Sequence, residues 1–287
     1  MKWAKLHGLG NDFLIARAAD AAGTGQSLGA LAKRMCRRHT GIGADGVLYY
    51  EPGVGDPAAD VAARIYNADG SEAEMSGNGT RCLAAYLTHI GNNPSATLRI
   101  RTVAGLRVFR LKDHEERAWT FESSMGCPVT DPALVPADLG DGSGPLIDHP
   151  LDVGPEVIPV TLSSMGNPHC STFWPDVDAV PIDALGPLLE NHPAFPQRAN
   201  VEFIQMLDRH RMRVRFWERG VGPTLASGTG SSAAVVAAIL SRRADTPVVV
   251  EVELGSLRVH WQAPGELLLT GPAEYICSCE IPEEVTP

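Results

Sequence analysis

The stretch Met75-Ser76-Gly77-Asn78-Gly79-Thr80 decides the fold, because the chain repeats its pattern at Ala226-Ser227-Gly228-Thr229-Gly230-Ser231. Each copy places a small polar residue before Gly-x-Gly and leads into an apolar segment with helical periodicity. Two polar residues, Asn67 and Glu218, precede the copies at one and the same spacing. Two such copies in a chain of 287 residues predict two related halves.

Each copy is also a candidate anion site. The first N–H groups of a helix have no partner inside it, and the positive end of the helix dipole lies beside them. Glycines let the backbone approach a carboxylate or phosphate closely. A single serine before Gly-x-Gly is ordinarily a helix N-cap. Two copies in matched surroundings favour a second role, in which Ser76 and Ser227 line a ligand site.

Composition favours an ordinary globular protein with 44% apolar and 20% charged residues. A net charge of −10 without a Lys/Arg cluster disfavours nucleic acid. The longest apolar run, Ala233–Leu240, is too short to cross a membrane, and Met1–Gly8 has no signal core. Six cysteines are too few for a disulfide scaffold, and no ligand-spaced partner accompanies Cys277 and Cys279. We therefore expect a cytoplasmic protein without membrane contact or a metal site.

Hydrophobic patterns predict mostly strands around one strong helix in each half, which favours α+β over a parallel βαβ sheet. A short amphipathic helix is expected at 28–36, and a linker in the Pro-, Gly- and Asp-rich segment 128–150. The segment Gly41–Gly46 matches the dinucleotide fingerprint only as a string, because no strand precedes it and a strand follows. Strands are expected at 3–6, 13–16, 47–50, 62–66, 98–103, 106–111, 117–121, 156–162, 171–174, 200–206, 211–217, 247–254, 257–262, 266–270 and 273–278.

Four strings together resemble one enzyme family. They are His7–Phe13, Asn67–Cys82, Gly166–His169 and Glu218–Gly230. In order and spacing they are similar to the diaminopimelate epimerases, amino-acid epimerases that work without pyridoxal phosphate. The resemblance extends from residue 7 to the C-terminus.

The resemblance implies two pseudo-symmetric α+β halves. Each half would be a mostly antiparallel sheet wrapped around a central helix, with the active site in the cleft between the halves. The N-terminal half would comprise 1–127, joined by the C-terminal strand 272–287, and the C-terminal half 128–271. Homodimers are common in such proteins.

The chain departs from the family at two positions. Epimerisation removes the Cα proton on one face of the substrate and returns a proton on the other, so it needs two acid/base groups. The family pattern has cysteine at both positions, whereas this chain has Ser76 and Ser227. A thiol has a pKa of about 8.5, lower at a helix N-terminus, and a serine hydroxyl is a far weaker acid. The serines keep hydrogen-bonding geometry and lose most of the base strength.

Three interpretations of the serines stay open. In the first, His169 and Glu218, which the resemblance places beside the reaction centre, make the hydroxyls competent. In the second, both cysteines of an ordinary family member have been replaced deliberately, to prevent oxidation or to trap a ligand. In the third, the protein is a relative that acts on another amino or hydroxy acid, for example as a racemase or dehydratase, or only binds its ligand.

The resemblance also implies the substrate contacts of an enzyme that converts LL-2,6-diaminopimelate to the meso form in lysine and cell-wall precursor synthesis. No cofactor is implied, and the partner is a small amino acid. Asn11, Glu218-Arg219 and His169 also have ordinary structural interpretations, as a turn former, a surface ion pair and a hydrogen-bonding residue. The implied contacts are the N–H groups of Gly77, Asn78, Gly228 and Thr229 for the α-carboxylate; Asn67, Asn167, Asn200 and Arg219 for the distal carboxylate; Glu218 with Asn67 for the distal ammonium; and Asn11 near the substrate.

Overall fold

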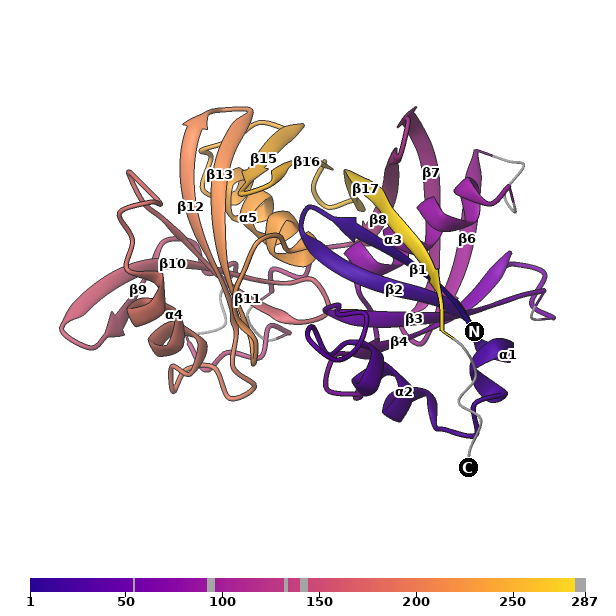
Figure 1. Ribbon diagram of the computed structural model, residues 1–287. Coiled ribbons are helices and arrows are strands. Elements are labelled where there is room, and N and C mark those ends of the chain that lie inside the picture. The colour runs from indigo at the N-terminus through magenta and orange to yellow at the C-terminus, as the bar shows by residue number, and fades with distance from the viewer. Residues whose placement is uncertain (54, 92–95, 132–133, 140–143, 282–287) are drawn as a thin grey trace. The chain divides into compact units, whose positions relative to one another are not determined.

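The chain divides into two compact units in the computed structural model, which describes residues 1–53, 55–91, 96–131, 134–139 and 144–281 (Figure 1). The first unit comprises Met1–Ser123 with Gly271–Pro287, and the second unit Ser124–Thr270. Residues 132–133 and 140–143 of the predicted linker, and 282–287 of the predicted C-terminal strand, lie outside the described residues.

The first unit consists of a sheet and a central helix, α3 (Gly77–His89). Strands β2 and β3 pair in parallel, as do β4 and β6. The antiparallel pairs are β1–β2, β1–β17, β3–β4, β4–β5, β6–β7 and β7–β8. Apolar side chains of α3 such as Leu83 pack on Ile15 and Phe109 of the sheet. The strands are β1 (Lys2–Gly8), β2 (Asn11–Arg17), β3 (Gly46–Pro52), β4 (Val61–Asn67), β5 (Glu72–Ala73), β6 (Thr97–Thr102), β7 (Gly105–Glu115), β8 (Ala118–Gly126) and the C-terminal part of β17 (Leu267–Glu280), and the smaller helices are α1 (Ala18–Ala22) and α2 (Leu28–Met35).

The turn between β1 and β2 positions one candidate site residue. Gly8 pairs with Asn11, so the loop is only two residues long. Its residues, Leu9 and Gly10, have φ of 54° and 89°. A two-residue hairpin with positive φ at both positions matches the twist of the strands. The tight turn therefore fixes Asn11 at the first position of β2.

The second unit also surrounds a central helix, α5 (Gly228–Leu240). Its residues from Gly230 to Ala238 are all buried, which is typical of a helix that is apolar on all sides. The pairs β11–β12 and β13–β15 are parallel. The antiparallel pairs are β9–β10, β10–β11, β12–β13, β13–β14, β15–β16 and β16–β17. The other elements are β9 (His149–Val153), β10 (Glu156–Ser164), β11 (Pro168–Phe173), α4 (Ile182–Glu190), β12 (Asn200–Asp208), β13 (Arg211–Glu218), β14 (Gly222–Thr224), β15 (Val248–Val252), β16 (Gly255–Trp261) and the N-terminal part of β17.

The predicted α+β class is confirmed, and the sequence prediction is wrong at a few elements. Strand β9 occupies the end of the predicted linker and pairs with β10. It was not predicted because proline, here Pro150, is uncommon within a strand. Helix α4 was missed because it contains Gly186 and Pro187. Gly271 suggested a break between two strands, but β17 continues through it. Within the described residues, no helix combines the length and hydropathy needed to cross a membrane.

Candidate functional site

The two repeated loops fold in the same way. Ser76 is the N-cap of α3, with φ −141° and ψ 116°, and its Oγ accepts a hydrogen bond from the Gly79 N–H at 3.0 Å. Ser227 is the N-cap of α5, with φ −133° and ψ 126°, and its Oγ accepts from the Gly230 N–H at 3.2 Å. The repeated sequence thus produces the same local structure in both units.

The caps leave two N–H groups of each helix available to an anion. Each serine satisfies the third helical N–H, so the first two, on Gly77 and Asn78 in α3 and on Gly228 and Thr229 in α5, have no partner inside the helix. The first turns, all of whose residues the structure describes, contain no acidic side chain. Both helix ends can therefore donate to a carboxylate.

Close packing explains the second glycine of each loop. A Cβ on Gly79 would lie 2.9 Å from Cδ1 of Leu48, and a Cβ on Gly230 would lie 2.8 Å from Cδ1 of Phe216. These contacts are shorter than ordinary van der Waals distances, so glycine lets each helix lie directly on its sheet. The first turn of each helix is thereby held at a fixed height above the strands.

A chain of hydrogen bonds in the first unit connects two predicted site residues. Nδ2 of Asn78 donates to Oδ1 of Asn11 at 3.2 Å, and Nδ2 of Asn11 donates to Asp45 at 2.9 Å. The chain begins at Arg81, whose Nη2 donates to Oδ1 of Asn78. Asn67 lies at the exposed end of β4, where its Nδ2 donates to Ser71 at 3.0 Å.

Arg81 itself was not predicted as a site residue. It is 1% exposed, and its Nε donates to the carbonyl oxygen of Pro272 in β17 at 2.8 Å. Burial lowers the pKa of Arg81 to about 10, which leaves the guanidinium charged at neutral pH. The signal in the sequence was an arginine within an otherwise apolar helix, directly before Cys82.

A buried network in the second unit surrounds His169. Its Nδ1 lies 2.6 Å from Oε1 of Glu202, and its Nε2 lies 2.9 Å from Oδ1 of Asn167. Oγ of Ser171 donates to Oε2 of Glu202 at 2.9 Å. Burial raises the pKa of Glu202, against the opposing effect of His169. Glu202 was missed because an acid in an apolar strand gives no sign of its partner.

The remaining predicted residues lie around the β13–β14 turn. Nδ2 of Asn200 donates to the carbonyl oxygen of Pro168, and its Oδ1 accepts from the backbone N–H of Arg219, both at 3.0 Å. Oε1 of Glu218 accepts from Thr224 at 2.7 Å. The Nη1 of Arg219 donates to the carbonyl oxygen of Gln197 at 3.0 Å.

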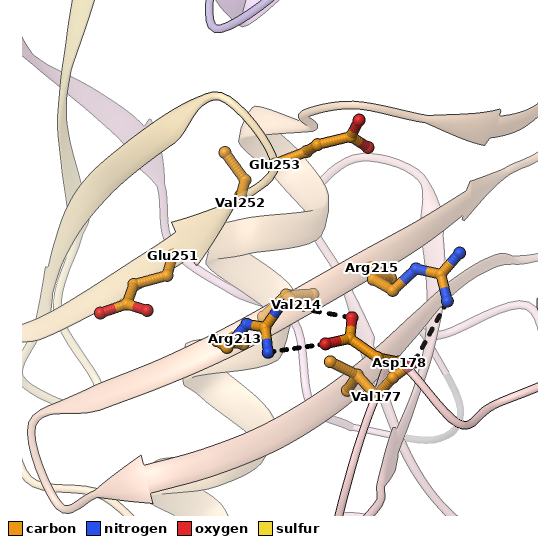
Figure 2. A pocket seen from close by; sticks show the side chains of 8 residues that line it. All are labelled: Val177, Asp178, Arg213, Val214, Arg215, Glu251, Val252 and Glu253. Atoms are coloured by element: carbon orange, nitrogen blue, oxygen red, sulfur yellow. Dashed lines mark hydrogen bonds and ion pairs between the residues drawn. The ribbon is translucent and has the colours of Figure 1, made fainter.

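A separate pocket of the second unit contains none of the predicted residues (Figure 2). Arg213 donates to Asp178 at 2.9 and 3.2 Å, and Arg215 donates to the carbonyl oxygen of Val177 at 3.2 Å. Another lining residue, Glu251, pairs with Arg211 of β13. Arg213, Asp178 and Glu251 are thus engaged in surface ion pairs, so these three side chains give no indication of a ligand. The residues that line the pocket are Val177, Asp178, Arg213, Val214, Arg215, Glu251, Val252 and Glu253.

Known sequences provide an independent comparison. The sequence model of the family described as diaminopimelate epimerase matches residues 3–130 and 161–276. A diaminopimelate epimerase of Pelotomaculum thermopropionicum is 42% identical over 282 residues, covering 98% of this chain and 99% of that protein. One of Synechococcus elongatus is 42% identical over 278 residues, covering 97% of each.

Solved structures support the fold. A hydroxyproline epimerase from Agrobacterium vitis superposes with a TM-score of 0.68 at 16% identity, covering 98% of this chain and 90% of that one. A phenazine biosynthesis protein of the PhzF family from Bacillus anthracis gives 0.66 at 16% identity, covering 98% of each chain. At this identity the likeness shows the fold alone, a two-half α+β architecture.

Proposed function

This chain belongs to the diaminopimelate epimerase family, and we propose that it converts LL-2,6-diaminopimelate to the meso form, a step of lysine and cell-wall precursor synthesis. The observation that carries the proposal is 42% identity to enzymes of that name over nearly the whole chain. The chemistry is the inversion of one Cα by proton removal on one face and proton return on the other. No cofactor takes part in the proposed reaction.

In this proposal the N-terminal ends of α3 and α5 bind the α-carboxylate of the substrate. The N–H groups of Gly77, Asn78, Gly228 and Thr229 are the donors, and the caps on Ser76 and Ser227 keep these groups oriented outward. Donors fixed before the reaction stabilise the negative charge that develops when the Cα proton leaves, because they need no reorganisation.

The distal end of the substrate is a second amino-acid group with its own carboxylate and ammonium. We assign the carboxylate to Asn67, Asn167, Asn200 and Arg219, whose planar guanidinium can bind both oxygens. The ammonium goes to Glu218, with Asn67. Buried polar groups left unpaired by a shorter substrate would be costly, so such a site selects strongly for diaminopimelate.

The serines define what the two acid/base groups can do. Each Oγ accepts the cap hydrogen bond and keeps its own hydrogen to donate. A hydroxyl can return a proton to the carbanion but removes one poorly. Glu218 is the residue proposed to assist it, because both ring nitrogens of His169 already have partners in Glu202 and Asn167. The proposed turnover is slow compared with that of a thiol enzyme.

The same two serines favour a second candidate function, a family member that binds the amino acid without turning it over. The backbone donors of both helix ends do not depend on the thiols. Tight binding without Cα exchange would distinguish this candidate from the enzyme.

Deuterium exchange tests the proposal. The protein is incubated with LL-diaminopimelate in D₂O, and loss of the Cα proton and appearance of the meso form are followed by NMR. Ser76→Cys with Ser227→Cys should increase exchange by about 10²-fold to 10⁴-fold, the usual contribution of a positioned acid/base group. Ser27→Cys is the matched control, because Ser27 is the N-cap of α2 and is not a predicted site residue.

The outcomes separate the candidates. Exchange that rises in the double cysteine variant and not in Ser27→Cys supports the epimerase. Absence of exchange in every variant, with binding of diaminopimelate by calorimetry, indicates the binding protein. Arg219→Ala should abolish use of diaminopimelate, whereas an enzyme for a monocarboxylate would tolerate the change.

A further inference from the structure

The buried network around His169 lies on one face of two paired strands. In the parallel pair β11–β12, Ser171 stands opposite Glu202 and His169 opposite Asn200. Side chains alternate along a strand, so all four point to the same face. The residues between them, such as Cys170 and Val201, belong to the apolar core on the other face.

The first turn of α5 covers this polar face. Phe216 of β13 stands opposite Glu202, and opposite residues of an antiparallel pair share a face. Gly230 of α5 lies directly on the ring of Phe216. The N-cap of that helix turn is Ser227, so Glu202 is paired with the residue on which the helix turn of a proposed acid/base residue packs.

Burial and hydrogen bonding determine how many protons the pair holds. The side chains of His169 and Glu202 are 0% and 1% exposed, so a net charge there would be very costly. With the Asn167 amide oriented so that Oδ1 faces the ring, Nε2 of His169 carries the hydrogen, because a carbonyl oxygen can only accept. One further proton lies between Nδ1 and Oε1 of Glu202. With these two protons the pair has no net charge.

The surroundings of Glu202 raise the pKa of its carboxyl group. Burial raises its pKa, and the charge of Glu218 adds to this rise, against the effects of His169 and Ser171. Ser171 donates to the second carboxyl oxygen, so both oxygens of Glu202 have a partner.

The consequence reaches Asn167, which is half-buried and follows Gly166, a residue with φ of 95°. Its Oδ1 is occupied by Nε2 of His169, so the amide can offer only its NH₂ group to a ligand. If Nε2 lost its hydrogen, the amide would turn its NH₂ toward the ring and present its carbonyl to the ligand. A carbonyl would repel a carboxylate.

We propose that Glu202 is a positioning residue that keeps hydrogen on Nε2 of His169 and thereby holds Asn167 as a fixed donor for a substrate carboxylate. The inference rests on the proposed function for the placement of Asn167 and His169 at the substrate. It extends that function to a residue that contacts no ligand and determines selection for an anion.

Two substitutions of Glu202 and a matched control test the proposal, with Asn167→Ala added in the second measurement. In Glu202→Gln the amide NH₂ can donate to Nδ1 and its oxygen can accept from Ser171, so hydrogen stays on Nε2. In Glu202→Leu neither bond forms, and His169 is free to change tautomer. Thr172→Val is the matched control, because Thr172 is buried on the opposite face of β11 and its hydroxyl has no partner among the described residues.

The first measurement needs no substrate. Two-dimensional ¹H–¹⁵N NMR of the histidine rings should show hydrogen on Nε2 of His169 in the unmodified protein, in Glu202→Gln and in Thr172→Val. A His169 ring with bare Nε2 in the unmodified protein overturns the proposal. This NMR measurement does not depend on turnover. A negative result would therefore overturn the role of Glu202 without bearing on the proposed epimerase function.

The second measurement is a double-mutant cycle on the KM for diaminopimelate, or on the Kd from calorimetry if the protein only binds. Glu202→Leu and Asn167→Ala should each weaken binding by about tenfold to a hundredfold, as expected for loss of a hydrogen bond to a charged group. The two together should be no worse than either alone, and Glu202→Gln should restore most of the loss. Additive losses, or a Glu202→Leu variant that binds like Thr172→Val, would refute the positioning role.

Discussion

The contact between α5 and its sheet gives a prediction that can be calculated from the structure. A Cβ on Gly230 would lie 2.8 Å from Cδ1 and 3.0 Å from Cε1 of Phe216, whereas a Cβ on Gly228 would meet nothing closer than 3.9 Å. Phe216 is 2% exposed, so its ring cannot move into solvent. Overpacking of this kind costs about 1–3 kcal/mol.

Gly228→Ala provides the internal reference. Alanine is favoured over glycine in a helix by about 1 kcal/mol, and this gain is shared by both substitutions in the first turn. The difference in unfolding free energy between Gly228→Ala and Gly230→Ala therefore isolates the clash, about 1–3 kcal/mol. At a urea m-value of about 2 kcal/mol per M, a difference of ~2 kcal/mol separates the midpoints by about 1 M.

Urea unfolding followed by circular dichroism and tryptophan fluorescence measures this difference. Phe216→Leu should reduce the gap between the two variants, since it removes the ring atoms that Cβ would meet. Equal midpoints for Gly228→Ala and Gly230→Ala would refute the claim that the second glycine sets the height of the helix above the sheet.

Three further predictions concern single interactions. Ser76→Ala and Ser227→Ala should each lower the unfolding free energy by about 1 kcal/mol, because the third N–H of each helix loses its acceptor; a loss well below that in urea unfolding would contradict the capping role. Burial raises the pKa of Asp12, but Lys5 and Arg38 outweigh it, so the net pKa is lowered. The ionised Asp12 carboxylate therefore contributes stability that is present above the unfolded pKa of about 3.9 and is lost as pH falls through the folded pKa. Asp12→Asn should flatten the decline of the urea midpoint at acid pH. An unchanged decline would exclude this role. Asp178→Ala should change the unfolding free energy by under about 0.5 kcal/mol and leave Cα exchange unaltered, since Asp178 and Arg213 are 59% and 43% exposed; a larger effect would mean that the pocket of Figure 2 contributes to function.

Local sequence patterns were enough to predict the two loops. A serine before Gly-x-Gly followed by an apolar helix specifies its own N-cap, and both copies have nearly the same φ and ψ. The residues that determine this cap are close neighbours in the sequence, so the cap can be predicted without knowledge of the fold. The same holds for helix α2, which was predicted at 28–36 and begins at Leu28 behind the capping Ser27.

Contacts between distant strands could not be predicted in this way. Glu202 reads in the sequence as a polar residue within the apolar strand β12, and its partner His169 lies on β11. Only the register of the parallel pair brings them to one face. Arg81 is a similar case, since its partner Pro272 belongs to a strand near the opposite end of the chain.

The serines also reveal what the chain retains when it lacks the thiols. A serine oxygen is a good cap acceptor, whereas a cysteine sulfur is a weak one, so a cysteine at either position should weaken its helix end by up to about 1 kcal/mol. The thiol supplies an acid/base group near neutral pH that the hydroxyl cannot. Compared with cysteines, Ser76 and Ser227 are therefore weaker acid/base groups but stronger N-caps of α3 and α5. The double cysteine variant should show both effects, a faster deuterium exchange at Cα and a lower urea midpoint. If its midpoint were unchanged, cap strength would not be what the serines contribute, and only the loss of base strength would remain to distinguish this chain from a thiol enzyme.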